Sequence, residues 1–327
     1  MNSGARQANR DRMQILGLFA LLLPPLLWAG NFVVGRAARA EVPPMMLAFA
    51  RHFVALVFLL PFGWTTIRRD LRRHWEYRWR VLCASLAGMV AFNLLTYSGL
   101  QFTTATSGQL MNSTIPVLIV LMGALFLGQR LRARQIFGMA FSCAGVLTIT
   151  LHGEFARLLT GQSLQGDLML FGAMLSFALF SVLLRDLPAD ADRLGLLGAQ
   201  LAVAVVVLFP FLVWEYLSGA RATWNAAAVA ALLYVGVAAC LLANLIYMFG
   251  IARVGPVRAG MFIHLVPLYG AFLSSALLHE HLHIYHAIGM AAIVAGLICS
   301  TVADAHPAQR QLSAMAGPTR PRQATGS

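Results

Sequence analysis

The sequence predicts an all-α integral membrane protein of ten transmembrane helices, built as two inverted five-helix repeats. Three observations predict this fold: the composition, the spacing of the apolar stretches and an internal repeat. Of the 327 residues, 59% are hydrophobic and 11% are charged, and the mean hydropathy is +0.73. Soluble domains carry about 25% charged residues. The composition therefore argues against a soluble enzyme and for a chain that faces lipid.

Apolar stretches follow one another with short connections along almost the whole chain. A helix needs about 20 mostly apolar residues to cross a bilayer. Such stretches cover residues 14–35, 44–63, 81–100, 105–127, 134–151, 167–186, 194–217, 226–250, 257–278 and 284–303. Two polar ends remain, an N-terminal arm over 1–13 and a tail over 304–327. The tail is rich in Pro, Gln, Gly and Ser, and we expect it to be disordered.

The arginines predict the topology. All 24 basic residues are arginines, and the net charge is +12. If both ends are cytoplasmic, 19 arginines fall in inside segments and 4 in outside segments, as the positive-inside rule requires. They lie between apolar stretches and form no basic groove with interleaved aromatics, so we expect lipid head groups, and not nucleic acid, as their partners. The sequence predicts no particular oligomeric state.

An internal repeat divides the chain into residues 14–151 and 152–303. A shift of 151 positions superimposes residues 93–145 on 244–296 without a gap, and a shift of 149 superimposes parts of the first two spans on the sixth and seventh. The identities include Asn93 with Asn244, Pro116 with Pro267, Gly138 with Gly289, Gly145 with Gly296, Ala29 with Ala178 and Pro61 with Pro210. Five spans is an odd number, so the copies must cross the membrane in opposite directions. Inverted repeats that enclose a midplane site are typical of secondary transporters, which expose that site alternately to each side.

Several short motifs occur in a fixed order along the predicted spans. They are Trp28-Ala29-Gly30-Asn31-Phe32, Pro43-Pro44, Ala50-Arg51, Gly99-Leu100, Thr103 to Ser107, Pro116, Gly138, Gly145 and Gly166-Asp167. In this order the sequence resembles the EamA family of the drug/metabolite transporter superfamily. The resemblance implies a ten-helix transporter, often an exporter of amino acids or other small metabolites, and here efflux across a bacterial inner membrane. One departure is that the family usually has a glutamate after spans 4 and 9, whereas this chain has Gln129 and Glu280.

Polar side chains within the predicted spans mark the expected substrate site, because polar groups in hydrocarbon usually face the bundle interior or a water-filled cavity. Gln109, Asn112 and Pro116 share one face of the fourth span, and the repeat places His264 and Pro267 on the matching face of the ninth. We expect substrate contacts from Trp28, Asn31, Arg51, Asn93, Tyr97, Gln109, Asn112, Asn244, Tyr247, His264 and Tyr269, and helix kinks at Pro116 and Pro267. Interhelical hydrogen bonding and plain packing remain the alternatives for these side chains.

Charged and titratable groups are rare inside the spans. Arg51 lies within the second span, where an arginine costs about 2.5–3.5 kcal/mol. It either attracts an anionic group such as a carboxylate, or snorkels outward or bonds to backbone carbonyls. No Asp or Glu lies deep in a predicted span, so we expect no carboxylate proton relay. Proton coupling through His52 or His264 is a hypothesis, since histidine titrates near neutral pH.

One motif points to a different class of protein. The run His279 to His283 reads H-E-H-L-H and matches H-E-x-x-H, which on a helix presents two histidines to zinc and a glutamate as general base. His286 is a candidate third ligand. Against an intramembrane metalloprotease, the equivalent residues of the first copy, 128–132, contain no histidine. We expect no enzyme activity, no metal and no cofactor. Within transport, the alternative is a metabolite importer or facilitative carrier, and outside it a passive channel.

Overall fold

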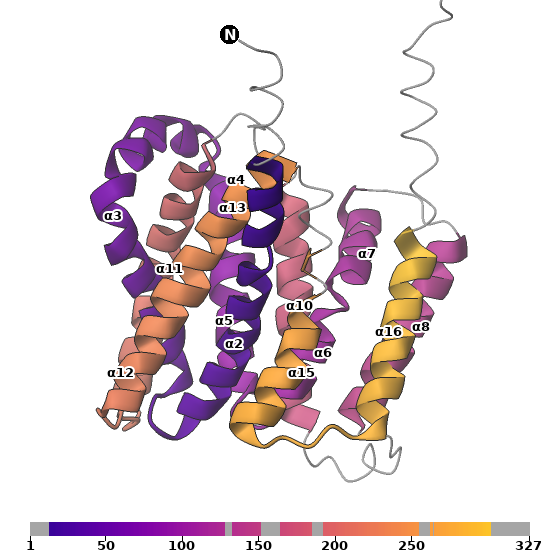
Figure 1. Ribbon diagram of the computed structural model, residues 1–327. Helices are drawn as coiled ribbons and strands as arrows, with labels where there is room; N and C mark the ends of the chain where they lie inside the picture. The colour runs from indigo at the N-terminus through magenta and orange to yellow at the C-terminus, as the bar shows by residue number, and fades with distance from the viewer. Residues whose placement is uncertain are drawn as a thin grey trace, which may run out of the picture.

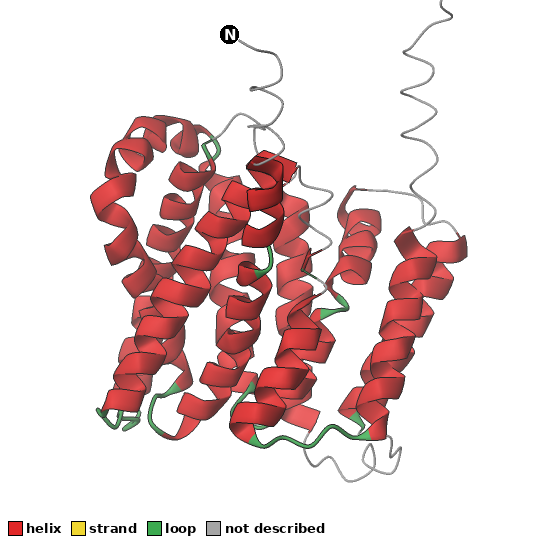
Figure 2. Cartoon of the chain, viewed as in Figure 1, coloured by secondary structure: helices red, strands yellow, loops and turns green. Residues whose placement is uncertain are grey.

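The computed structural model describes residues 13–127, 133–151, 164–184, 192–254, 262–263 and 265–301. Every regular element in these ranges is a helix (Figure 2). Residues 1–12 of the predicted arm and the whole predicted tail lie outside the described residues. So do His264, which we predicted to contact substrate, and Gln129.

Sixteen elements make up the described bundle (Figure 1). Those of the first half are α2 (Leu23–Ala37), the 3-10 helix η1 (Ala38–Ala40), α3 (Pro44–Glu76), α4 (Arg78–Ser85), the π-helix η2 (Leu86–Ala91), α5 (Phe92–Gly99), α6 (Ala105–Asn112), α7 (Ile115–Leu127) and α8 (Ala133–Thr150). Those of the second half are α10 (Leu164–Leu184), α11 (Arg193–Leu217), α12 (Ala226–Leu233), the π-helix η3 (Tyr234–Leu242), α13 (Ala243–Val254), α15 (Leu265–Leu278) and α16 (Ile284–Thr301).

Six helical stretches in the described part are long and apolar enough to cross a membrane, and the bent pair α6 and α7 makes a seventh. The six are Met13–Ala40, Pro44–Arg69, Arg78–Gly99, Leu164–Leu184, Arg193–Leu217 and Ala226–Val254. The apolar helices α8, α15 and α16 coincide with three further predicted spans but are shorter. The chain is therefore an all-helical, multi-pass membrane protein, and the count of ten spans stays a prediction.

The outer surface of the bundle is apolar. Large side chains such as Phe137, Val206 and Phe272 are 65%, 72% and 70% exposed. A soluble protein rarely exposes so many large apolar groups. In a bilayer the same groups face lipid tails, which are as apolar as the side chains themselves.

The two halves of the chain interleave, and equivalent helices exchange partners. The helix α2 packs on α15 and η3, and its repeat counterpart α10 packs on α6, α7 and η2. Likewise α3 packs on η3, and its counterpart α11 packs on η2. A contact that recurs with the roles of the two partners exchanged is the pattern expected of a two-fold axis.

The contact between α8 and α16 follows the same rule at the level of single residues. A Cβ on Gly145 would collide with the carbonyl oxygen of Gly289, and one on Gly296 would collide with that of Gly138. The shift of 151 residues relates Gly138 to Gly289 and Gly145 to Gly296. Gly145 therefore contacts the counterpart of Gly138, and Gly138 contacts the counterpart of Gly145. The helices run antiparallel, with backbones close enough that only glycine fits at these crossings, as in other close pairs of membrane helices.

Substituting Gly145 by valine should destabilise the fold by about 1–3 kcal/mol, because the new side chain would be forced against the α16 backbone. Thermal unfolding of the protein in detergent would measure the loss. The matched control is Gly172→Ala, where an added Cβ would make only an ordinary contact with Leu95 at 3.4 Å. The control should keep or raise the melting temperature, since alanine favours a helix more than glycine does. Equal losses in the two variants would contradict the close α8–α16 contact.

Candidate substrate-binding site

A polar cluster joins α2, α3 and α5 inside the bundle. Arg51 donates through Nη1 to Asn31 Oδ1, and to the Tyr97 hydroxyl at 3.3 Å. The Tyr97 hydroxyl in turn donates to Asn31 Oδ1 at 2.7 Å. The three side chains are 5%, 8% and 1% exposed in the order Asn31, Arg51, Tyr97. Three of the predicted site residues thus meet in one buried network.

The guanidinium of Arg51 points into the protein and does not snorkel outward. Its contacts in the described part of the chain are with neutral groups: Asn31, Tyr97 and the buried thiol of Cys240. Its Nε atom is buried and has no hydrogen-bond partner among the described residues. A buried positive charge without a neutralising carboxylate is costly. The sequence predicted either an anionic partner for Arg51, or outward snorkelling or bonds to backbone carbonyls. Among the described residues, the second alternative does not describe this arrangement.

The next residue, His52, is fully buried and faces α5. Its Nδ1 lies 2.7 Å from the carbonyl oxygen of Ala48, which can only accept, so Nδ1 carries the proton. The other nitrogen, Nε2, then accepts from Asn93 Nδ2 at 3.4 Å. In its neutral form, the His52 imidazole thus makes a hydrogen bond through each of its two ring nitrogens. Protonating His52 would require the Asn93 amide to turn away, and proton coupling through His52 stays a hypothesis.

Two predicted site amides, Asn93 and Asn244, bind the backbone at the π-helical segments. Asn93 donates to the carbonyl of Met89 at 2.8 Å, and Asn244 donates to that of Cys240 at 2.6 Å. The two bonds are equivalent in the repeat, as are η2 and most of η3. π-helical turns disturb the regular hydrogen-bond pattern and occur often at functional sites. The asparagine side chains supply a donor where the pattern changes, which is a structural role for both residues.

Another predicted residue, Gln109, joins α6 to α15. Its Nε2 donates to Ser274 Oγ at 3.1 Å. Its Oε1 lies against Gly270, in the space where a Cβ would be placed, and finds no hydrogen-bond partner in the part of the chain that the structure describes. Both Gln109 and Ser274 are fully buried. For Gln109, this arrangement is the interhelical hydrogen bond that we stated as the alternative to substrate contact. The absence of a side chain at Gly270 of α15 leaves room for it.

The chain breaks between α6 and α7, with a bend of 50°. Pro116 cannot donate to the carbonyl four residues earlier, and its ring would collide with that carbonyl. The residue four positions earlier is Asn112, where α6 ends. Asn112 is half-buried at this break. Pro267 lies in the first turn of α15, where a missing N–H leaves no helical bond unmade.

The predicted aromatic residues lie in helix contacts. Trp28 of α2 and Tyr247 of α13 meet edge to face, with ring centroids 5.3 Å apart and ring planes at 65°. Tyr269 lies half-buried on α15. Plain packing, the alternative stated for the aromatics, describes Trp28 and Tyr247 in this structure.

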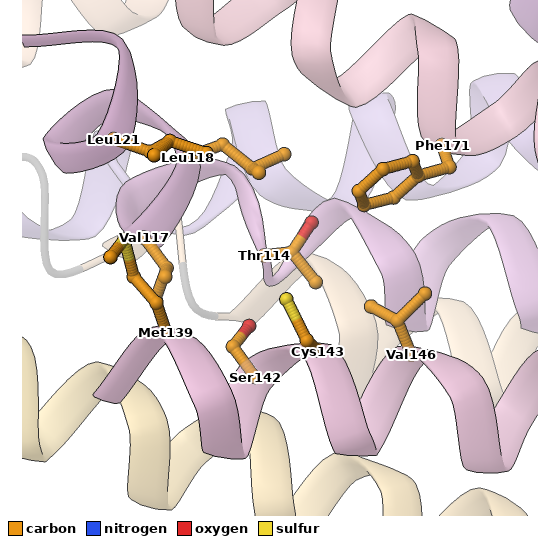
Figure 3. Close-up of a pocket in the computed structure, with 9 residues that line it drawn as sticks. All are labelled: Thr114, Val117, Leu118, Leu121, Met139, Ser142, Cys143, Val146 and Phe171. Atoms are coloured by element: carbon orange, nitrogen blue, oxygen red, sulfur yellow. The ribbon is translucent and has the colours of Figure 1, made fainter. Parts of the chain in front are cut away.

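A small apolar cavity of about 20 Å³ lies beside the helix break, between α7, α8 and α10 (Figure 3). Its lining is Thr114, Val117, Leu118, Leu121, Met139, Ser142, Cys143, Val146 and Phe171. This volume holds about one water molecule. None of the predicted site residues lines it. Among the predicted substrate-contacting residues that the structure describes, Asn31, Arg51, Asn93, Tyr97 and Gln109 are buried, and the others are half-buried.

The connection between α15 and α16 lies at one end of the bundle (Figure 1). It contains Glu280, which the sequence did not place in the site and which contacts the start of α6. Glu280 accepts from the backbone amides of Ala105 and Thr106 at 3.0 and 2.9 Å and from the Thr106 hydroxyl at 2.7 Å. The third amide of α6, that of Ser107, is capped by Thr104 at 3.0 Å. The free amides at the start of a helix attract a carboxylate. Glu280 therefore ties the connection after α15 to the start of α6.

A second glutamate does the same for α3. Glu215, near the end of α11, accepts from the amides of Met45 and Met46 at 3.1 and 2.9 Å. The preceding residue, Pro44, has no amide proton to satisfy. Each of these two helices has a recognisable start in the sequence, Pro43-Pro44 for α3 and Thr103-Thr104 for α6. Each glutamate lies near the end of another helix, but only the fold shows which glutamate caps which helix.

The H-E-x-x-H motif does not adopt the conformation that a zinc site requires. Residues 279–283 form no helix, so the two histidines are not held on one helical face. Both carboxylate oxygens of Glu280 are occupied by α6. The described residues contain no group of three or more His, Cys, Asp or Glu side chains that could hold a metal ion.

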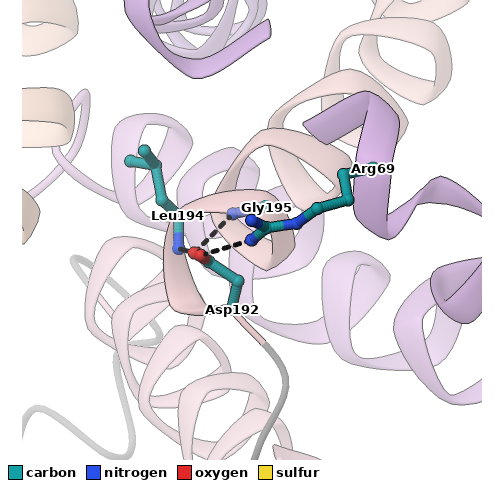
Figure 4. Close-up of polar contacts among 4 residues, drawn as sticks. All are labelled: Arg69, Asp192, Leu194 and Gly195. Carbon is teal, nitrogen blue, oxygen red and sulfur yellow. Dashed lines mark hydrogen bonds and ion pairs between the residues drawn. The ribbon is translucent and has the colours of Figure 1, made fainter. Parts of the chain in front are cut away.

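The other end of α3 contacts α11 through an exposed ion pair (Figure 4). Arg69 Nη2 lies 3.3 Å from Asp192 Oδ2, with the two side chains 68% and 36% exposed. Asp192 also caps α11 by accepting from the amides of Leu194 and Gly195 at 2.9 and 3.4 Å. Exposed pairs of this kind contribute at most about 1 kcal/mol. This exposed pair is therefore a weaker contact between α3 and α11 than the buried contact of Glu215 with the amides of Met45 and Met46.

Comparison with known proteins identifies the family. The model of the EamA-like transporter family matches the chain twice, over residues 15–151 and 164–302. The chain therefore belongs to the EamA-like transporter family, as the motifs predicted.

Curated relatives cover most of the chain. An "Uncharacterized transporter" of Archaeoglobus fulgidus is 26% identical over 86% of this chain and 96% of its own length. A "Probable amino-acid metabolite efflux pump" of Escherichia coli is 24% identical over 86% of this chain and 93% of its own. A "Probable terminal-alkyne amino-acid exporter" of Streptantibioticus cattleyicolor is 26% identical over 76% and 81%. One solved structure matches with a TM-score of 0.54 and 20% identity, over 89% of this chain and 98% of the other, and shows the same fold.

Replacing Gly270 by alanine should lower the melting temperature, because the new methyl group would occupy the place of Gln109 Oε1. We expect a loss of about 1–3 kcal/mol in the wild-type background. In a Gln109→Ala background the same substitution should cost much less, because the clash is gone. Thermal unfolding of the four proteins forms a double-mutant cycle. Equal losses in both backgrounds would show that the two side chains are not in contact.

Replacing Glu280 by alanine should destabilise the protein by about 0.5–2 kcal/mol, the usual cost of losing a helix cap. The loss arises because two amides of α6 lose their acceptor. Thermal unfolding in detergent would measure it. His281→Ala is the matched control, since His281 is an exposed neighbour in the same connection, and it should leave the melting temperature unchanged. Equal effects of the two variants would contradict the cap.

Proposed function

We propose that this protein is a secondary transporter that exports amino acids or related small metabolites across a bacterial inner membrane by alternating access. The observation that carries the proposal is the exchanged packing of two segments that each match the same transporter family. Residues 15–151 and 164–302 match the family model separately. Their helices meet in pairs whose roles are exchanged, down to the glycines of α8 and α16.

The antiparallel crossing of α8 and α16 supports the inverted relation of the two copies. Two equivalent helices that run in opposite directions place their copies in opposite orientations across the bilayer. Such a pair can rock about its shared axis and expose one site to each side in turn. The positive-inside count supports ten spans with both termini in the cytoplasm.

The two ends of the bundle supply the gates in this mechanism. In the proposed topology, the end closed by Glu280 and Glu215 faces outward. Opening it separates the start of α6 from α15 and the start of α3 from α11, so each carboxylate must exchange backbone amides for water. The opposite end is held in part by the exposed Arg69–Asp192 pair, which exchanges with water at little cost. In the proposed mechanism, the contacts of Glu280 and Glu215 belong to a state that is closed on the outward side.

The predicted substrate contacts become reachable as the helices part. Asn31, Arg51 and Tyr97 are contributed by α2, α3 and α5, and Gln109 lies at the α6–α15 contact. All four are buried in the closed state. The amino-acid class is supported by the names of two relatives, one an amino-acid metabolite efflux pump and the other an amino-acid exporter.

Counterflow in proteoliposomes tests the proposal. Vesicles loaded with an unlabelled amino acid should accumulate the same labelled amino acid transiently from outside, and the rate should saturate with concentration. The twenty amino acids would be screened in turn, with empty vesicles as the control. A passive channel would conduct without saturation or counterflow, and that result for every solute would contradict the transporter. The sidedness of uptake in oriented vesicles separates an exporter from an importer or facilitative carrier.

A further inference from the structure

We propose that Arg51, Asn31 and Tyr97 form the subsite that binds the carboxylate of the transported solute, and that this subsite exists only in the first half of the chain. The inference rests on the proposed transport function and adds which group of the substrate is recognised and where. The solute would be a carboxylate-bearing metabolite held with its anionic end toward α2, α3 and α5.

The first argument is charge. Arg51 is 8% exposed, and its contacts within the described residues are all neutral. An arginine retains its charge even when buried. Burying a charge without a partner of opposite sign costs free energy, because the charge remains uncompensated. A site in this condition gains much of that free energy back when an anion arrives.

The second argument is geometry. Arg51 Nη1 and the Tyr97 hydroxyl both direct a proton at the same atom, Asn31 Oδ1. One oxygen that accepts from a guanidinium and a hydroxyl together is the role that a carboxylate oxygen fills. The amide oxygen of Asn31 thus stands in for the ligand in the closed state. The buried Arg51 Nε has no hydrogen-bond partner within the described ranges and is available there as a further donor.

The third argument is the asymmetry of the repeat. In the shift of 149 residues, Arg51 corresponds to Gln200 of α11. Gln200 is 4% exposed and carries no charge, and no described residue accepts a hydrogen bond from its Nε2. Both copies keep a buried polar side chain at this position, but only the first is cationic. A solute with one carboxylate can therefore bind in one orientation and not in its two-fold related alternative.

Asn31→Asp is the decisive variant. It changes one amide nitrogen to oxygen and places a carboxylate beside Arg51, where the side chain already accepts two hydrogen bonds. We expect the unliganded variant to melt at a higher temperature than the wild type, because the guanidinium is neutralised from within. We also expect it to lose the response to carboxylate solutes. Arg51→Gln should lose that response as well, by removing the charge.

The measurement is a thermal-stability screen of the purified protein at constant chloride concentration. Each of the twenty amino acids would be compared with its methyl ester and with the amine that lacks the carboxylate. A ligand that binds the folded state raises the melting temperature. We expect at least one amino acid to stabilise the wild type while its ester and amine do not, and its apparent affinity to fall at least tenfold in both variants. Gln200→Leu is the control and should keep the wild-type response.

Three results would overturn the subsite. One is a wild-type response in Asn31→Asp. Another is stabilisation by the esters and amines equal to that by the amino acids. The third is the absence of any carboxylate-dependent shift across the panel. If Arg51→Gln fails to fold, Asn31→Asp still decides, because it keeps the arginine. Saturable counterflow without carboxylate dependence would leave the transport function standing and remove only the subsite, whereas the absence of counterflow for every solute would remove both.

Discussion

The fold depends on one constraint: every backbone group freed by a helix start, break or widening inside an apolar bundle must find a partner within the protein. The chain meets it with two glutamates from distant parts of the sequence and with two local asparagines. Glu280 satisfies the first amides of α6, and Glu215 those of α3. Asn93 and Asn244 serve the π-helical segments. Because two of these partners belong to the opposite half of the chain, capping the helices also fastens the halves together.

The same contacts link stability to movement. In the proposed mechanism, opening that end of the bundle exchanges the contacts of each carboxylate for water, so the groups that cap α6 and α3 would contribute to the energy of opening. The glycine crossing of α8 and α16 lies outside these end contacts. Arg51 adds a buried charge whose compensation by a ligand would favour the closed state.

Several features of the site could be predicted from the sequence. Asn31, Arg51 and Tyr97 are polar groups in apolar stretches, and the cost of burying them alone implies that they meet partners. The break before Pro116 follows from local backbone chemistry. The partners of Gln109 and Glu280, in contrast, lie more than 160 residues away in the sequence. No local pattern distinguishes an amide that binds a substrate from one that binds the opposite helix, and several predicted contacts serve as interhelical bonds here.

The sequence by itself determined the class of the protein, its family and its helical character, because hydropathy, the arginine distribution and the repeat are properties of residue order alone. Only the tertiary structure decided which side chains meet. In the structure, Glu280 of the H-E-x-x-H motif accepts hydrogen bonds from the start of α6, and residues 279–283 form no helix. The motif therefore lacks the helical geometry on which the zinc interpretation depended. The tertiary structure also buried Arg51 among neutral groups. Side-chain pairing across the bundle depends on how helices approach in space, and spacing along the chain does not specify that approach.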